Sequence, residues 1–585
     1  MTPAPLVAKV LPDVSGIDKE FDYLVPDELR PALQLGDVVR VPLHGRRVGG
    51  WVLGIAAHDG QVAVDRLRPI AKITGRGPQP DVVELARWAQ KRWAARGLRP
   101  FLGVASPPRA VTSVPCPAAR VAAPAPEPRD ARAAELLAEG GGVLRVGPNA
   151  DLVPVVSAAM ALGPALVVVP GVDEARLLAA RLRRRNVDVA LVPDEWAAAC
   201  GGVQVMVGTR TAVWAPCPEL SVVIVGDEHD EALQEERSPT WHARDVAIER
   251  ARQAQAPVVL VSPSPTVTAL DWAPGRVRLP SVAESRAAWP LVDLVDRSRE
   301  EPWKTSMLTS PLISALRDPE RTVVCVHNAK GRARIVACRT CRALARCERC
   351  GAAVHVGDDR RFSCGRCGLG RPAVCQQCTG TGFANLRPGV ARLRDDIAAA
   401  ANRPAVAVTG DDHGRPEHAG VYVGTEAVLH RVDRADVVAF LDIDAELLAP
   451  RYRASEQAMA LLIRAARLVG LRTGGGRLLV QTYLPRHEVL QAVLLADPGR
   501  MAAVEASRRR ELGLPPYSAL ASVSGAGAEE FAAALAHESL TVGRRPGATQ
   551  FLVRAPDWEQ LGSALTATPR PPHSRLRIQV DPPRA

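Results

Sequence analysis

Eight of the twelve cysteines of this chain fall within residues 338–378. They form four Cys-x-x-Cys pairs, and two thiolates at this spacing can bind one face of the same metal ion. Two such pairs complete the tetrahedral site that structural zinc prefers, so eight ligands predict two zinc ions. The pairs are Cys338/Cys341, Cys347/Cys350, Cys364/Cys367 and Cys375/Cys378.

The lengths of the intervening segments predict how these pairs combine. Five residues separate the first two pairs, which is short for a chain that must wrap around one ion, whereas thirteen separate the second and third. Thirteen residues are enough for the hairpin of a zinc ribbon, so we expect nested sites. The inner ion would lie on Cys347, Cys350, Cys364 and Cys367, and the outer on Cys338, Cys341, Cys375 and Cys378. The alternative is a disulfide cluster, which is typical of an exported protein.

The amino-terminal sequence favours zinc over disulfides. MTPAPLVAKV contains no apolar segment of a secretion signal before Lys9,. No uncharged run of the sequence reaches the length that spans a bilayer. We therefore expect a cytoplasmic protein that has no membrane partner and whose thiols stay reduced.

The charge balance is compatible with a nucleic-acid partner. Lysine and arginine number 74 against 63 acidic residues, which gives a formal net charge of +11. Most of these cations are arginine, whose guanidinium can bind phosphate with two hydrogen bonds. The alternative is a genome that encodes arginine in place of lysine throughout, and net charge alone does not separate the two interpretations.

The pattern of apolar runs predicts a multidomain α/β chain. Runs such as Ala165–Pro170 and Val437–Asp444 are nearly continuous and alternate with helical segments, as parallel strands buried on both faces do,. Two sets of such runs predict two doubly wound lobes. The predicted divisions are a β-rich amino-terminal domain at 1–105, a proline-rich linker at 106–130, a first lobe at 131–295, a second lobe at 296–337 and 379–485, a zinc-ribbon-like insert at 338–378, and a small α+β carboxyl-terminal domain at 486–585.

Two lobes of this kind in series suggest a nucleotide-driven translocase, yet the expected nucleotide motifs are altered. A phosphate-binding loop needs a lysine after its glycines, and here that position falls on Asp151 or Leu152. A later segment, IVGDEHD, retains Asp227, Glu228 and His229 but begins with Gly226. These residues are either a vestigial catalytic site or polar side chains at the end of a strand.

Several motifs, in their order and spacing, resemble the PriA family of replication restart proteins, also called primosomal protein N′. Most members of that family are DExH-type helicases, so the resemblance implies two RecA-like helicase lobes. It extends through almost the whole chain and includes the eight-cysteine pattern. The other shared segments include FDYLVPDEL (21–29), VGTRTAVWAP (207–216), WHARDVAIERA (241–251), LDIDAELLAPRYRASEQ (441–457), VQTYLP (480–485) and LGLPPY (512–517).

Four catalytic motifs depart from the family pattern. The phosphate loop lacks its final glycine and lysine, Gly226 replaces the metal-linked acid, and VSPSPT (261–266) replaces GSATPS. IRAARLVGL (463–471) replaces the arginine-finger motif, although Arg464 and Arg467 remain nearby. Loss of this lysine and of the arginine frame removes most transition-state stabilisation. We therefore expect a helicase fold without competent ATP hydrolysis, which leaves ATP and Mg²⁺ doubtful as cofactors.

The resemblance also implies a DNA site in the amino-terminal domain, which in the family captures the 3′ end of a nascent strand at a fork. An aromatic ring can stack on the terminal base, and a carboxylate can accept a hydrogen bond from the 3′-hydroxyl. Without the resemblance, Phe21 would be read as a core residue and Asp22 as a turn former. The implied pocket residues are Phe21, Asp22, Gly36 and Arg68.

The resemblance further implies partners at the replication fork, on the nucleoid. They are branched DNA forks and single-stranded DNA, single-strand-binding protein, other primosome proteins and the loader of the replicative helicase. The winged-helix domain of the family has no counterpart here, because only the proline-rich linker lies at its place. His242 and Arg244 fall where the first lobe of the family faces DNA, with a helix cap as the alternative. The competing functions are an active ATP-dependent 3′-to-5′ helicase with a divergent nucleotide site, and a zinc scaffold that binds DNA weakly.

Overall fold

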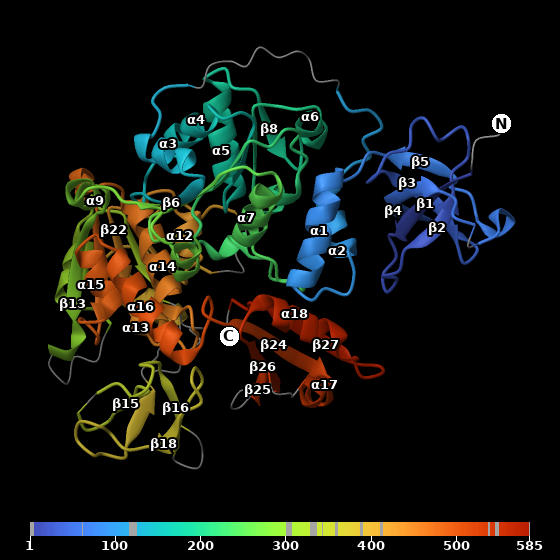
Figure 1. Cartoon of the computed structure of the whole chain (residues 1–585). Coiled ribbons are helices and arrows are strands. Elements are labelled where there is room, and N and C mark those ends of the chain that lie inside the picture. The colour runs from blue at the N-terminus through green and yellow to red at the C-terminus, as the bar shows by residue number, and fades with distance from the viewer. Residues whose placement is uncertain are drawn as a thin grey trace.

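The structure is a computed structural model that describes residues 5–583 except 61, 116–125, 300–306, 328–335, 342, 357–360, 386–389, 410–413, 536–538 and 545–548. Part of the predicted linker therefore lies outside the described residues. Figure 1 shows a β-rich domain at one end, two α/β lobes, and a small cysteine-rich module beside the second lobe. In this view the carboxyl-terminal domain lies between the cysteine-rich module and the β-rich domain. The predicted α/β multidomain class is confirmed.

The amino-terminal domain is a small barrel of five strands in the order β2-β1-β4-β3-β5. Residues 68–71 close it, because the amide of Leu24 donates to the carbonyl of Arg68 (3.0 Å) and the amide of Ala71 donates to the carbonyl of Arg40 (2.8 Å). Alternate residues such as Tyr23 point into the barrel and form its core,. The strands are β1 (Leu6–Pro12), β2 (Phe21–Leu24), β3 (Val38–Leu43), β4 (Arg46–Ala57) and β5 (Lys72–Gly75), with a 3₁₀ turn at Val64–Arg66.

Two helices that follow the barrel, α1 (Pro80–Arg92) and α2 (Arg99–Ala105), pack into the first lobe. The ring of Phe101 lies 5.5 Å from that of Trp214 in this lobe. Within the domain predicted at 1–105, the barrel itself ends at Gly75, and the apolar faces of α1 and α2 are buried against the first lobe.

The first lobe is a seven-stranded parallel sheet in the order β12-β6-β11-β10-β7-β9-β8. Its central strands are buried throughout, as the continuous apolar runs predict. The strands are β6 (Gly141–Arg145), β7 (Ala165–Val168), β8 (Val189–Val192), β9 (Val205–Gly208), β10 (Val222–Val225), β11 (Val258–Ser262) and β12 (Val277–Arg278). The helices are α3 (Ala131–Ala138), α4 (Val153–Ala159), α5 (Val172–Arg183), α6 (Trp196–Cys200), α7 (Ala243–Gln253), α8 (Val267–Trp272) and α9 (Val282–Ala288), with 3₁₀ turns at Arg210–Trp214 and Glu231–Leu233.

The second lobe is a six-stranded parallel sheet in the order β13-β23-β22-β14-β21-β20. Its strands are β13 (Leu291–Asp296), β14 (Val323–Val326), β20 (Val406–Val408), β21 (Val421–Gly424), β22 (Val437–Phe440) and β23 (Arg477–Thr482). Its helices are α10 (Ser310–Arg317), α11 (Val390–Ala401), α12 (Val428–Arg431), α13 (Asp444–Leu447), α14 (Ala454–Val469), α15 (Glu488–Leu494) and α16 (Gly499–Leu512), with 3₁₀ turns at Arg297–Arg299 and Arg472–Gly474.

Both predicted boundaries of this lobe are corrected. Strand β13 pairs with β23 along its whole length, so the second lobe begins at Leu291 rather than at 296. Helices α15 and α16 also belong to it, because Val489, Leu490 and Met501 pack in the lobe core. The boundary predicted at 485/486 therefore precedes two helices of the lobe.

The cysteine-rich module is inserted between β14 and α11 and consists of short antiparallel strands. Strand β15 (Val336–Cys338) pairs with β19 (Phe383–Asn385), and β17 (Arg361–Cys364) lies between β16 (Val354–Val356) and β18 (Gly370–Pro372). The module lies at the edge of the second lobe (Figure 1). Its small apolar core includes Phe362 and four of the cysteines.

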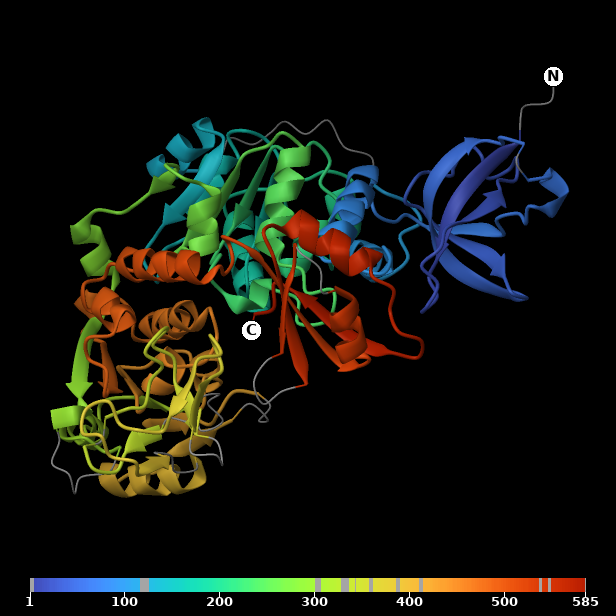
Figure 2. The same cartoon turned by 60° about the horizontal axis from the view of Figure 1, so that its bottom comes forward.

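The carboxyl-terminal domain has the order β-α-β-β-α-β and the sheet order β25-β26-β24-β27, which is a ferredoxin-like arrangement. Its helix α18 lies against α1 (Figure 2), where the guanidinium of Arg92 stacks 3.8 Å from the ring of Trp558. The elements are β24 (Ala519–Ala526), α17 (Ala528–Leu535), β25 (Thr541–Arg544), β26 (Gln550–Ala555), α18 (Trp558–Ala567) and β27 (Arg575–Val580). Within the described residues, every helix is too short or too polar to cross a membrane.

Candidate functional site

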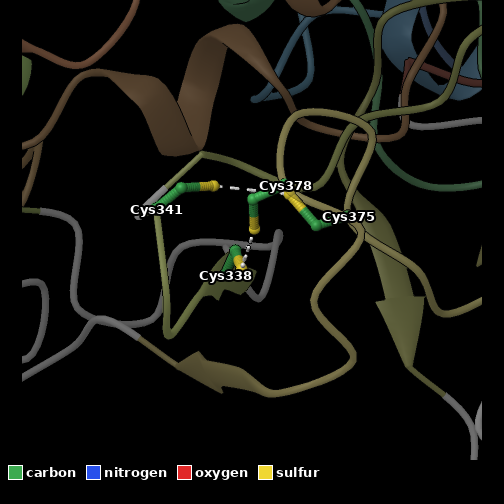
Figure 3. Close-up of side chains that lie close together, drawn as sticks. All are labelled: Cys338, Cys341, Cys375 and Cys378. Atoms are coloured by element: carbon green, nitrogen blue, oxygen red, sulfur yellow. Dashed lines mark hydrogen bonds between the residues drawn. The ribbon is translucent and has the colours of Figure 1, made fainter.

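The eight cysteines gather in two groups of four, and the grouping is the nested one. One group is Cys338, Cys341, Cys375 and Cys378, and the other is Cys347, Cys350, Cys364 and Cys367. Figure 3 shows the four side chains of the first group pointing toward one another. In each group, sulfurs from different pairs lie 3.4–3.5 Å apart, and all four lie within 4.8 Å of one another.

These distances fit zinc better than disulfides. A disulfide joins its sulfurs at about 2.05 Å, whereas four sulfurs at about 2.3 Å from one ion lie roughly 3.8 Å apart. Backbone amides assist the thiolate form: the amide of Gln377 donates to Cys375 Sγ at 3.4 Å. A hydrogen bond from the backbone of Cys341 lowers the pKa of Cys338 to about 6. Four sulfur ligands without an open position describe closed, structural metal sites.

At the other candidate centre, a cavity of about 320 Å³ lies where the strand ends of the first lobe face the second. It is bounded by the loop at 146–152, which follows β6, and by Gly226, Asp227 and Arg467. In this loop Asp151 Oδ1 accepts a hydrogen bond from the amide of Val153 (2.9 Å) at the start of α4, and its other oxygen pairs with Arg181. A carboxylate therefore takes the position at a helix amino terminus that would suit a phosphate.

Two of the sequence departures meet in this cavity. A Cβ added at Gly226 would lie 3.0 Å from Leu152 Cδ2 and 3.3 Å from Val169 Cγ1. An aspartate at position 226 would thus require Leu152 to move. The apolar residue in the phosphate loop and the glycine at the strand end are therefore sterically linked.

The three retained residues of the acidic motif are all engaged within the protein. Asp227 Oδ1 lies 2.5 Å from Arg467 Nη2 of the second lobe. Burial raises the pKa of this carboxyl, but Arg467, His229 and Arg464 together outweigh burial, so the pKa is lowered. Glu228 is fully buried and pairs with Arg244 at 2.8 Å. His229 Nδ1 hydrogen-bonds Ser262 Oγ at 3.0 Å. Each of the three retained residues thus has a protein partner in this structure.

Further polar contacts clamp the two lobes together around this cavity. Arg464 of α14 lies 2.5 Å from Asp230, and Arg467 also donates to the carbonyl of Pro148 in the degenerate phosphate loop (2.8 Å). The side chain of Gln457 bonds Glu231. Two arginines of the last helicase motif thus bind protein carboxylates and carbonyls at the place where the family pattern implies a γ-phosphate.

His242 and Arg244 form part of this packed interior. His242 Nδ1 accepts from the amide of Arg244 (3.1 Å) and caps α7, and both side chains are buried. The helix-cap interpretation therefore describes them, and neither presents a surface to DNA. The sequence signal was present, because a histidine directly before a helix can supply the capping acceptor.

Burial of His242 predicts a pH dependence of stability. Burial, aided by the charge of Arg244, lowers the pKa of His242 from its ordinary value of 6.5 to about 3. The neutral ring is favoured in the folded state, so its contribution is complete above about pH 6.5 and is lost as the pH falls toward 3. At pH 5 this loss is about 2 kcal/mol. Urea unfolding of the wild type and of His242→Asn, which retains a capping acceptor, should show a smaller loss between pH 7 and pH 5 in the variant; equal losses would contradict this assignment.

The structure brings together only part of the DNA-end pocket. Asp22 is exposed on β2 opposite Lys9, and the exposed Arg68 lies beside this strand through its bond to Leu24. Phe21 points the other way, packs on the barrel core and has the Lys19 ammonium 5.9 Å from its ring. The accessible charged groups on this side of the barrel include the Asp22 carboxylate, the Arg68 guanidinium and the Lys9 ammonium.

Gly36 lies apart from this group and has a structural role. In the sheet, strands β1 and β4 lie between Gly36 and β2. The amide of Gly36 donates to the carbonyl of Val52 on β4, Val52 pairs with Val10 on β1, and Val10 pairs with Phe21 on β2. Its φ is +89°, and a Cβ there would lie 1.7 Å from the carbonyl oxygen of Pro78. Glycine is therefore required by the backbone at this position, and its role in the DNA-end pocket stays a prediction.

Comparison with known proteins places these features in a family. Residues 9–97 match the family model of the PriA 3′ DNA-binding domain. The chain is 30% identical to the probable replication restart protein PriA of Mycobacterium tuberculosis strain CDC 1551, over 88% of this chain and 85% of that protein. It is 29% identical to the Mycobacterium leprae protein, over 97% and 99%, and 28% identical to the Bacillus subtilis protein, over 58% and 45%.

Two RecA-like lobes, a cysteine-rich insert and a 3′ DNA-binding domain define a helicase-like DNA-binding protein. The chain belongs to the family of replication restart protein PriA. Among solved structures, Saccharomyces cerevisiae Dbp5 bound to RNA and ADP-BeF₃ is similar at 10% identity, with a TM-score of 0.33 over 64% of this chain and 89% of that one. That likeness is too low to carry an argument, and the fold assignment follows from the strand order.

Proposed function

We propose that this protein recognises stalled or abandoned replication forks and helps to reload the replicative helicase without hydrolysing ATP. Membership of the family and the 3′ DNA-binding domain support the DNA role. The observation that carries the loss of catalysis is the nucleotide cavity itself. Asp151 occupies the phosphate position of α4, and Arg467 is paired with Asp227.

The chemistry of the cavity argues against nucleotide turnover in this protein. A triphosphate would meet a carboxylate where a lysine is required, and its charge would be repelled. The two arginines that remain would have to leave their carboxylate partners before they could reach a γ-phosphate. Each of these changes removes transition-state stabilisation, which is the main contribution of such a site.

The expected result of a DNA-stimulated ATPase assay is therefore turnover at the background rate. Purified full-length protein would be measured with Mg²⁺ and ATP, with and without forked DNA, beside a family member that has an intact phosphate loop. Binding of ATP, followed by thermal shift, should be absent as well. DNA-stimulated turnover well above background would support instead an active 3′-to-5′ helicase with a divergent nucleotide site.

The 3′ end of a DNA strand is the proposed ligand of the barrel. Asp22 would accept a hydrogen bond from the terminal 3′-hydroxyl, Arg68 would bind a phosphate, and Phe21 would support Asp22 from the core side and contribute only a ring edge to the base. Exposure of Asp22 and Arg68 on one side of the barrel supports these roles. Gly36, the fourth proposed pocket residue, would shape the turn before β3 through its positive φ.

Asp22→Ala should weaken binding to a fork with a free 3′-hydroxyl by about tenfold or more, since a hydrogen bond to a charged group contributes about 1.5–3 kcal/mol. Binding to a fork with a 3′-phosphate should change little, because the blocked end cannot donate. Asp27→Ala is the matched control, with an aspartate side chain 85% exposed on the same domain. Equal affinity of the wild type for free and blocked ends would contradict the pocket while leaving the ATPase result unaffected.

The partners are proposals on the same basis. The cysteine-rich module would dock other primosome proteins and the helicase loader, and the carboxyl-terminal domain would bind single-strand-binding protein. The two zinc ions would be structural cofactors of this docking surface. A zinc scaffold that binds DNA weakly is the competing function, and measured fork affinity indistinguishable from that for blunt duplex would favour it.

A further inference from the structure

The side chain of one arginine of the cysteine-rich module extends out of the module and is buried in the interior of the protein. Arg366 lies between Cys364 and Cys367 of the inner group, and its side chain is only 5% exposed. It donates to the carbonyl of Tyr452 (3.1 Å) and to that of Cys350 (3.4 Å), a member of the same group. Its Nη2 lies 3.6 Å from Glu505 Oε1 on α16. The inner metal site is thus tied to the second lobe by a buried cation.

On helix α16, this contact leads into a series of buried acidic and basic side chains that alternate in sign. Glu505, 1% exposed, binds Arg509 (3.0 Å) and Arg508 (2.6 Å) on its own helix. Arg509 in turn binds Glu456 of α14 at 2.6 Å. A buried charge must keep a partner of opposite sign, because an unpaired one is strongly destabilising. Each side chain in this series is therefore fixed by its neighbours.

The series ends in the first lobe. Glu456 Oε1 accepts from the amide of Val267, the first residue of α8, at 2.8 Å. The preceding residue, Thr266, caps α8 and bonds Glu228 through both its hydroxyl (2.6 Å) and its amide (3.1 Å). Polar contacts thus run without a break from the inner cysteine group to Glu228 of the former catalytic motif.

We propose that the inner metal site is a latch on the lobe interface. With zinc bound, the Cys364–Cys367 turn holds Arg366 in place, and Glu505, Arg509 and Glu456 transmit that position to α8. Occupancy of the inner site then keeps the lobes closed, a state that in a nucleotide-driven helicase depends on ATP. The latch concerns lobe closure alone, so it stands or fails independently of the DNA and ATPase proposals.

The test is hydrogen–deuterium exchange of the zinc-loaded full-length protein, read at the peptide that covers residues 264–270. Arg366→Gln should raise exchange there by about tenfold or more while zinc content stays unchanged. Arg349→Gln is the matched control, because Arg349 occupies the same position in the Cys347–Cys350 turn but is exposed. Glu456→Gln removes the charged acceptor of the Val267 amide directly and should also raise exchange.

The outcomes separate the latch from a purely local role of the metal. If Arg366→Gln lost zinc, Glu505→Gln would replace it, since Glu505 touches no cysteine and should raise exchange at 264–270 equally. Unchanged exchange in either variant with both zinc ions present would overturn the proposal. Equal increases in Arg366→Gln and Arg349→Gln would overturn it too, as would a selective removal of inner-site zinc that left the peptide protected.

Discussion

Replacing Cys347 and Cys367 together by serine should leave the protein with about one zinc ion, whereas replacing Cys341 and Cys347 together should leave none. The first pair of cysteines belongs to one group and the second pair spans both. A tetrahedral site that loses a thiolate ligand holds zinc far more weakly. Zinc would be counted by mass spectrometry or by release to a chromogenic chelator, with the wild type expected at about two equivalents.

The same pair of variants discriminates the nested pairing from a pairing of neighbours. If neighbouring Cys-x-x-Cys pairs shared an ion, the results would be exchanged: Cys341/Cys347 would retain one ion and Cys347/Cys367 none. Cys217→Ser, a change at a buried cysteine of the first lobe, controls for the loss of a thiol as such. Zinc ligation contributes on the order of 10 kcal/mol in small zinc domains, so the fully depleted variant should also lose the protease resistance of the module.

Arg244→Ala should destabilise the first lobe by about 3–5 kcal/mol, because it leaves the fully buried Glu228 without its counter-charge. The side chains of Arg244 and Glu228 are 3% and 0% exposed. Urea unfolding followed by tryptophan fluorescence would report the change, since Trp214 and Trp241 are packed in this lobe. In a family member whose acidic motif is catalytic, the equivalent glutamate is expected to matter for turnover instead.

Arg252→Ala is the control for this prediction. Arg252 lies on the same helix α7 and pairs with Glu249 at 2.7 Å, but its side chain is 70% exposed. Exposed pairs of this kind contribute about 0–1 kcal/mol. A loss in Arg244→Ala no greater than in Arg252→Ala would show that Glu228 has access to water or to another partner.

The features that could be predicted from the sequence are those with a local cause. Parallel strands such as β7, β10 and β22 were recognisable because a strand buried on both faces must be apolar throughout,. Strand β13 was assigned to the wrong lobe: its sequence LVDLVD does not show which sheet it joins, and only its pairing with β23 does. Chain order likewise does not reveal that the apolar faces of α1 and α2 are buried against the first lobe.

The candidate site likewise combines features that could be predicted from the sequence and features that only the folded structure shows. The sequence shows directly that Asp151 and Gly226 stand in the nucleotide motifs. It does not show which residues they contact in the folded protein. Contact of Asp227 with Arg467 joins residues 240 positions apart, and no local pattern encodes such a pair. For Gly36, the sequence could not show the close approach of Pro78, which makes glycine necessary at this position.

The sequence by itself determined the cysteine pairing, the lobes and the family, since these depend on segment length, hydrophobic period and motif order. Only the tertiary structure decided that Asp227 pairs with Arg467 across the lobes, that Glu228 is buried against Arg244, and that Arg366 joins the inner cysteine group to Tyr452 and Glu505 of the second lobe. The physical reason is that burial and charge pairing depend on how the side chains are arranged in three dimensions. A carboxylate is catalytic, structural or exposed according to what surrounds it, and its neighbours here come from segments far apart in the chain.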